Sequence, residues 1–203
     1  MGKMSLKEMN FYLKKCGIGF NQETIEYTPL LGVHHQHEWD YGYESGIGFS
    51  GPRRIFYADM YEMIRFLNCY FKISEVSELI VAPFYRYNQF DKRYYTIKNK
   101  MPGVDIFDEI RTFLKRNGIK KGERTGIKLS VDEGYDDLAM IIEGSFRGVS
   151  ELCLFSIERQ VLIVPNHHFD LAFFTNNIVD EKEKIRLLLR DFPVLRYYEK
   201  LLT

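Results

Sequence analysis

Histidines and their acidic neighbours are the residues of this chain best suited to chemistry. All five histidines fall in two short clusters, residues 34–37 and 167–168, each followed by acidic residues. On an extended chain, positions two apart share a face, so His35 and His37 could bind one ion together. A histidine and a carboxylate from the second cluster would complete a zinc site, or an iron site with two histidines and one carboxylate. The candidate metal ligands are His35, His37, His167, His168 and Asp170.

This hypothesis requires the two clusters to meet in space. The chain would then be a metal-dependent hydrolase that binds zinc or another divalent metal, with Glu38 as its general base. The spacing matches no named metal motif, however. The alternative is that the histidines lie in loops and at strand edges, that Asp170 accepts hydrogen bonds from turn amides, and that no cofactor is bound.

A second candidate is the aromatic and basic segment 84–95, which reads FYRYNQFDKRYY. Tyrosine, phenylalanine, arginine and asparagine are enriched in protein interfaces, because they combine rigid area with hydrogen-bonding ends. The same mixture can stack nucleotides, or can form a hairpin whose aromatic residues alternate between core and solvent. The residues predicted to contact a protein partner are Phe84, Tyr85, Arg86, Tyr87, Phe90, Arg93 and Tyr94.

Other patterns that resemble functional motifs fail in context. Residues 46–51 fit GxGxxG, but Pro52 and a strand-like RRIFY follow where a dinucleotide-binding fold needs a helix. The basic turn at 115–124 is typical of a solvated helix end in a neutral chain. The cysteines at 16, 69 and 153 are far apart in apolar surroundings, which predicts core thiols in a reducing compartment.

The bulk composition narrows the class of protein. Lys+Arg 28 equals Asp+Glu 28, which argues against a general nucleic-acid or anionic-membrane binder. No window approaches the roughly 18 apolar residues of a membrane span, and the first residues contain no signal-peptide run, so we expect no membrane partner and a cytoplasmic protein. The abundance of Lys, Ile, Asn, Tyr and Phe suggests a bacterial or phage source.

The periodicity predicts a single α+β domain spanning residues 1–203, with a mainly antiparallel sheet and about five helices. Helices are expected at 5–16, 59–71, 105–117, 180–192 and from Pro193 to the end. Ser5 and Glu8 fit a capping box for the first helix, Asp59 is expected to cap the second, and Gly17 and Gly118 are placed to end the first and third. Strands are expected at 53–57, 76–83, 126–131, 138–143, 151–157, 160–164 and 169–175. Short spacers between the last of these strands imply hairpins and a meander in the C-terminal half. Residues 30–52 read as bends or irregular strands.

Size, composition and motif content together favour a non-enzymatic interaction protein. We expect a cytoplasmic domain that binds and inhibits a protein partner, and an immunity protein that neutralises a bacterial toxin is a common class of this size. The metal-dependent hydrolase remains the rival hypothesis. Nucleic-acid binding through the aromatic segment and the basic turn is a third, which would show affinity that falls steeply with salt.

Overall fold

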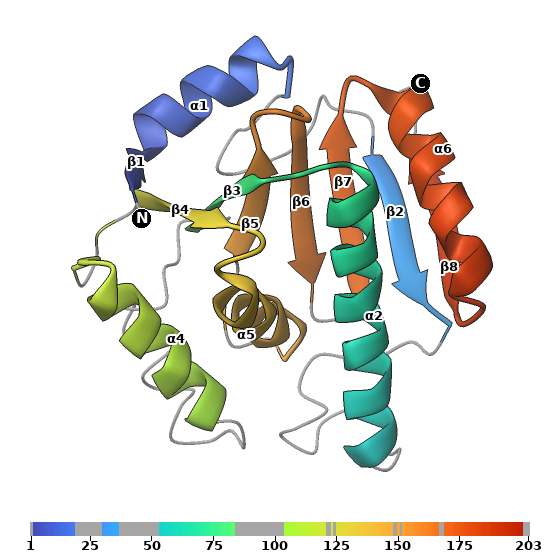
Figure 1. The fold of residues 1–203 in the computed structure, drawn as a ribbon, viewed down its shortest axis with the longest axis horizontal. Helices are drawn as coiled ribbons and strands as arrows, with labels where there is room; N and C mark the ends of the chain where they lie inside the picture. Colours follow the sequence, from blue (N-terminus) through green and yellow to red (C-terminus); the bar gives the residue numbers. More distant parts are fainter. Residues whose placement is uncertain are drawn as a thin grey trace.

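The fold is described from a computed structural model, which places residues 2–18, 30–36, 53–83, 104–120, 123, 125–147, 150, 152–166 and 169–200. These residues form five α-helices and one eight-stranded sheet in which every strand pair is antiparallel. The predicted α+β fold with a mainly antiparallel sheet is therefore confirmed (Figure 1).

The strand order across the sheet is β1-β4-β3-β5-β6-β7-β2-β8, so β1 and β8 form its two edges. The strands are β1 (Lys3–Ser5), β2 (Leu30–His35), β3 (Glu78–Pro83), β4 (Thr125–Ser130), β5 (Leu152–Ser156), β6 (Val161–Asn166), β7 (Asp170–Thr175) and β8 (Leu195–Lys200). The helices are α1 (Leu6–Lys15), α2 (Arg53–Ile73), α4 (Val104–Arg116), α5 (Tyr135–Phe146) and α6 (Ile178–Leu188), the last followed by a 3₁₀ turn at Leu189–Asp191.

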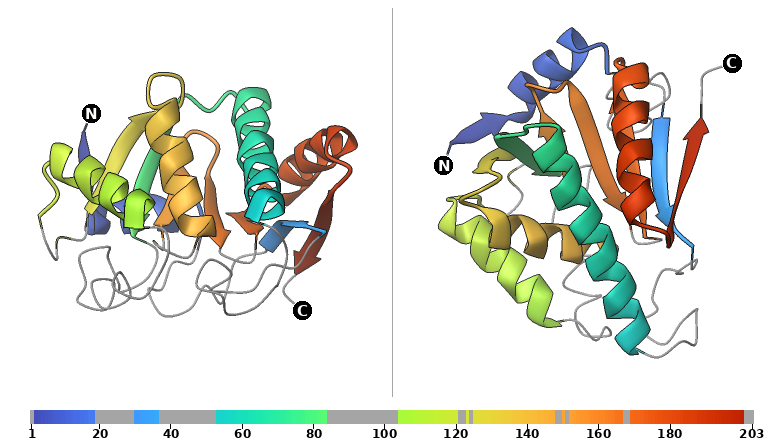
Figure 2. Two further views of the ribbon diagram at one scale, coloured as in Figure 1. Left: turned by 90° about the horizontal axis from the view of Figure 1, so that it is seen from below. Right: turned by 45° about the vertical axis from the view of Figure 1, so that its right-hand side comes forward.

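Helices cover both faces of the sheet, but unequally. Helices α2, α4, α5 and α6 lie on one face and α1 lies on the other (Figure 2). Strand β3 shows the consequence, because Leu79 and Val81 pack with the four helices while Ile80 and Ala82 pack with α1. Strands that are buried on both faces must be apolar at every position, which explains the uninterrupted apolar runs of the central strands.

Local signals placed several helix ends correctly. The predicted capping box of α1 is present, since the Glu8 amide donates to Ser5 Oγ at 3.2 Å and the Ser5 amide donates to Glu8 Oε2 at 2.8 Å. Gly17 and Gly118, predicted to end their helices, have φ values of 69° and 70°. That left-handed conformation is the usual helix-terminating position for glycine.

Two segments that were predicted as strands are helical. Residues 53–57 form the first turns of α2, and Asp59 consequently lies inside that helix instead of capping it. Residues 138–143 belong to α5, whose buried Leu138, Ile141, Ile142 and Phe146 recur at helical spacing. A short apolar run cannot distinguish a buried strand from a buried helix. Over the longer segment the buried residues recur at helical spacing, and the segment is a helix.

Two further segments were predicted wrongly for a different reason. The segment after Pro193 was predicted as a helix but is strand β8, and 30–35, predicted as irregular, is the regular strand β2. Both strands are specified by their partners, because β2 pairs with β7 on one side and with β8 on the other. Such non-local pairing leaves little trace in the segment itself.

Candidate functional site

The register of β2 against β7 brings the first histidine cluster to the start of β7. His34 lies opposite Asp170, and the His35 amide donates to the Phe169 carbonyl at 3.0 Å. The other predicted ligands, His37, His167 and His168, lie outside the described residues, as does Glu38. Two parts of the predicted metal site thus lie close together at one end of the sheet.

His35 and Asp170 nevertheless face opposite sides of the sheet. Asp170 shares the α1-side face with His34, its partner across the two strands. The side chain of His35 is on the face covered by α2, α4, α5 and α6. There it is 1% exposed, and its Nδ1 lies 3.4 Å from a carboxylate oxygen of Asp59 in α2. The two side chains therefore cannot ligate one ion. Within the described ranges, no group of three or more His, Cys, Asp or Glu side chains is arranged to hold a metal.

Asp170 accepts a hydrogen bond that connects β8 to β7 across the strand between them. The Tyr198 hydroxyl donates to both carboxylate oxygens of Asp170, at 2.7 and 2.8 Å. To reach β7 from β8, the Tyr198 ring lies over Gly32 of β2, where an added Cβ would come within 2.0 Å of the ring. Burial and the adjacent carboxylate raise the pKa of the Tyr198 phenol well above its usual value, so it remains a hydrogen-bond donor at neutral pH.

A different part of the molecule carries an exposed apolar and basic surface, on α6 and the edge strand β8. Val179 is 80% exposed and Leu187 is 53% exposed, and a groove of about 600 Å³ runs beside them. We call this the α6–β8 surface. Its residues are Ile178, Val179, Lys182, Glu183, Arg186, Leu187, Arg190, Tyr197 and Glu199.

The charges of the α6–β8 surface are incompletely neutralised. Lys182 pairs with Glu199 at 2.6 Å. The guanidinium carbon of Arg186 lies 5.2 Å from the centre of the Tyr197 ring, a cation–π contact that orients the side chain without cancelling its charge. Among the described residues, neither Arg186 nor Arg190 forms an ion pair with a carboxylate. Two guanidinium groups therefore stand beside exposed aliphatic side chains.

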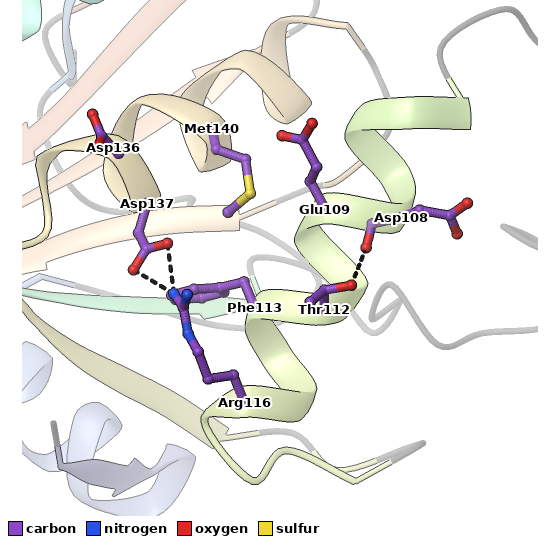
Figure 3. Close-up of a pocket in the computed structure, with 8 residues that line it drawn as sticks. All are labelled: Asp108, Glu109, Thr112, Phe113, Arg116, Asp136, Asp137 and Met140. Carbon is purple, nitrogen blue, oxygen red and sulfur yellow. Dashed lines mark hydrogen bonds and ion pairs between the residues drawn. The ribbon is translucent and has the colours of Figure 1, made fainter.

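Helices α4 and α5 lie at the other end of the helical layer (Figure 1), and an acidic groove runs between them (Figure 3). We call it the α4–α5 groove; it measures about 440 Å³ and is lined by Asp108, Glu109, Thr112, Phe113, Arg116, Asp136, Asp137 and Met140. Arg116 reaches from α4 to the Asp137 carboxylate of α5 at 2.6 Å, as Figure 3 shows. This largely exposed ion pair bridges the two helices and contributes at most about 1 kcal/mol, and we assign the groove no ligand.

The partner-binding residues predicted from the aromatic segment, Phe84 to Tyr94, lie outside the described residues, so that prediction remains untested. The α6–β8 surface was missed from the sequence. Its signal was present, because Val179 and Leu187 fall off the buried stripe of Ile185 and Leu188. Large aliphatic residues on the polar side of an amphipathic helix are candidates for contact with a partner.

Comparisons with protein-family models, with curated proteins and with solved structures found no match for this chain. None of the helices in the described ranges combines the length and apolar character needed to cross a bilayer.

Proposed function

We propose that this protein is a non-enzymatic interaction protein that binds and inhibits a protein partner, and that the α6–β8 surface is its contact region. One observation carries the proposal: exposed Val179 and Leu187 flank a groove together with Arg186 and Arg190, and neither arginine is within ion-pair distance of a carboxylate among the described residues. Arginine and tyrosine are enriched at the energetic centres of interfaces, and this surface offers both in contact.

Binding of a partner would bury exposed apolar area on the α6–β8 surface. Burying a leucine side chain stabilises a complex by roughly 1.5–3 kcal/mol, so a half-exposed Leu187 has part of that still to gain. Arg186 is already held against Tyr197, which lowers the conformational entropy lost on binding. A partner that presents carboxylates around an apolar centre would complement both features.

The finer parts of the proposal rest on composition and size. We propose a cytoplasmic immunity protein that neutralises a bacterial toxin by covering its active surface. The content of Lys, Ile, Asn, Tyr and Phe suits a bacterial source. The aromatic segment at 84–94, as predicted, would extend the contact with the same partner.

The test is affinity capture from the source organism with the full-length chain. Arg186→Glu/Leu187→Ser should lose the captured partner. The matched control, Phe11→Ser/Lys14→Glu, makes the same two kinds of change on exposed positions of α1, on the other face of the sheet, and should retain it. A partner that both variants capture equally would move the contact away from the α6–β8 surface. Inhibition is tested by co-expression with the identified partner, whose toxicity the wild-type chain should suppress.

The metal-dependent hydrolase is kept as a second candidate, because one observation favours it. The β2–β7 register brings residues 34–35 beside residues 169–170, as a shared site would require. Its ligands would come from Asp170 with His37, His167 and His168. Elemental analysis of the untagged protein, purified without chelator, tests this candidate: near-stoichiometric zinc, iron or manganese lost in Asp170→Asn would support it, and metal-free folded protein would end it.

A further inference from the structure

The α6–β8 surface includes the edge of the sheet. Strand β8 is last in the strand order and pairs with β2 through six residues, Leu195–Lys200. Among the described residues, no strand pairs with its other side. An edge strand offers a row of backbone donors and acceptors to any extended segment that lies beside it.

Helix α6 lies over this edge, on the same face of the sheet as α2, α4 and α5 (Figure 2). Two contacts fix its position, since Arg186 lies over the Tyr197 ring and Lys182 pairs with Glu199, so side chains of alternate β8 residues meet α6. The groove of about 600 Å³ is lined by residues of α6 and by Glu199 of β8. It is therefore adjacent to the position that a ninth strand would occupy.

We propose that the partner docks as an extended segment that pairs with β8. The side chains of this segment that face α6, at every second position, include both apolar and acidic residues. This inference rests on the proposed function. A strand added about 4.8 Å from β8 would direct every second side chain toward α6. There, apolar side chains would meet Val179 and Leu187, and carboxylates would meet Arg186 and Arg190.

The charge on the remaining face of β8 has the same sign. Arg196 projects to the opposite face from Tyr197 and donates to the Leu195 carbonyl and to Gln36 Oε1, with no carboxylate partner among the described residues. An acidic segment would therefore meet arginine side chains on both sides of the new strand, and in the groove the basic residues outnumber Glu183 and Glu199.

The test uses random peptides of about twelve residues, displayed on phage and selected on the full-length protein. We expect enriched sequences in which every second position is apolar or acidic. The best peptide should bind Arg186→Glu/Arg190→Glu about tenfold more weakly or worse, and should bind the α1 control Lys7→Glu/Lys14→Glu normally. In amide hydrogen-exchange NMR, it should slow exchange at the β8 amides that do not bond to β2.

The possible outcomes distinguish strand pairing with β8 from contact through the α6–β8 surface without strand pairing. Peptides with apolar residues at helical spacing, lost in the arginine variant but without slowed exchange in β8, would overturn strand pairing and leave the α6–β8 surface as the contact region. Peptides that bind both variants equally, or a selection with no enrichment, would overturn the strand proposal; the partner-capture experiment then decides the proposed function by itself.

Discussion

Helices α2 and α6 are joined by a buried hydrogen bond whose removal should cost measurable stability. Tyr70 is 0% exposed and Glu181 is 1% exposed, and the phenol donates to Glu181 Oε2 at 2.5 Å. Lys184 lies 3.1 Å from the other carboxylate oxygen. In Tyr70→Phe the ring keeps its contact with Phe173, at 5.0 Å between centroids, so no cavity forms and the loss reports the hydrogen bond.

The magnitude follows from the charge on the acceptor. A hydrogen bond to a charged group contributes about 1.5–3 kcal/mol, and leaving a buried carboxylate short of one donor places Tyr70→Phe toward the upper part of that range. For a chain of this size, such a loss lowers Tm by roughly 4–10 °C. Glu181→Gln should be destabilising as well, because it leaves Lys184 without that charge.

The assay is urea unfolding followed by circular dichroism on both single variants and the double variant. The two changes should be non-additive, with a coupling energy of about 1 kcal/mol or more. The control is Tyr61→Phe on the same helix, where a side chain 56% exposed should change stability by less than about 0.5 kcal/mol. If Tyr70→Phe is as mild as this control, or if the two effects simply add, the buried pair does not hold α2 to α6.

Three further predictions concern titration, packing and thiol reactivity. Burial and adjacent carboxylates raise the pKa values of Tyr70 and Tyr198 above the ordinary 10.0, so above that pH the folded state binds more protons than the unfolded state. Stability should therefore fall as pH rises past about 10, and less steeply in Tyr198→Phe, in pH-dependent urea titrations. Gly32→Ala should displace the Tyr198 ring and cost about 1–3 kcal/mol in the same assay. Burial raises the pKa of the Cys153 thiol to about 12, so it should resist a thiol reagent until urea unfolds the chain.

Each of these has a contradicting result. A flat stability profile above pH 10 would mean that the phenols ionise equally in both states. A Gly32→Ala protein as stable as wild type would place the Tyr198 ring elsewhere, and Gly32→Ala combined with Tyr198→Phe should be less than additive if the clash is the cause. Rapid modification of Cys153 in the native protein would contradict its burial.

Features set by a few neighbouring residues were predictable from the sequence. The capping box at Ser5 and Glu8 and the helix-ending glycines depend on local geometry, and they were placed correctly. The buried stripe of α2, for example Met60, Met63 and Leu67, follows from helical period alone. Short spacers between the C-terminal strands sufficed to predict antiparallel pairing.

Features set by distant partners were not predictable. Strand β8 exists because β2 pairs with it across more than 150 residues of chain, and the segment alone resembled a helix. The meeting of His34 with Asp170, and the opposite orientation of His35, follow from a register that no local pattern encodes. The α6–β8 surface was not predictable for the same reason. It combines α6 residues that lie outside the buried stripe of that helix with β8, a strand that the sequence did not predict.

The most direct test of the account is the affinity of the captured partner, measured by titration calorimetry against three proteins. Wild type and the α1 control Phe11→Ser/Lys14→Glu should bind with the same Kd. Arg186→Glu/Leu187→Ser should bind about 100-fold more weakly, since losing two central contacts of about 1.4 kcal/mol each corresponds to that factor. An unchanged Kd in this variant, with its fold intact by circular dichroism, would contradict the assignment of partner binding to the α6–β8 surface.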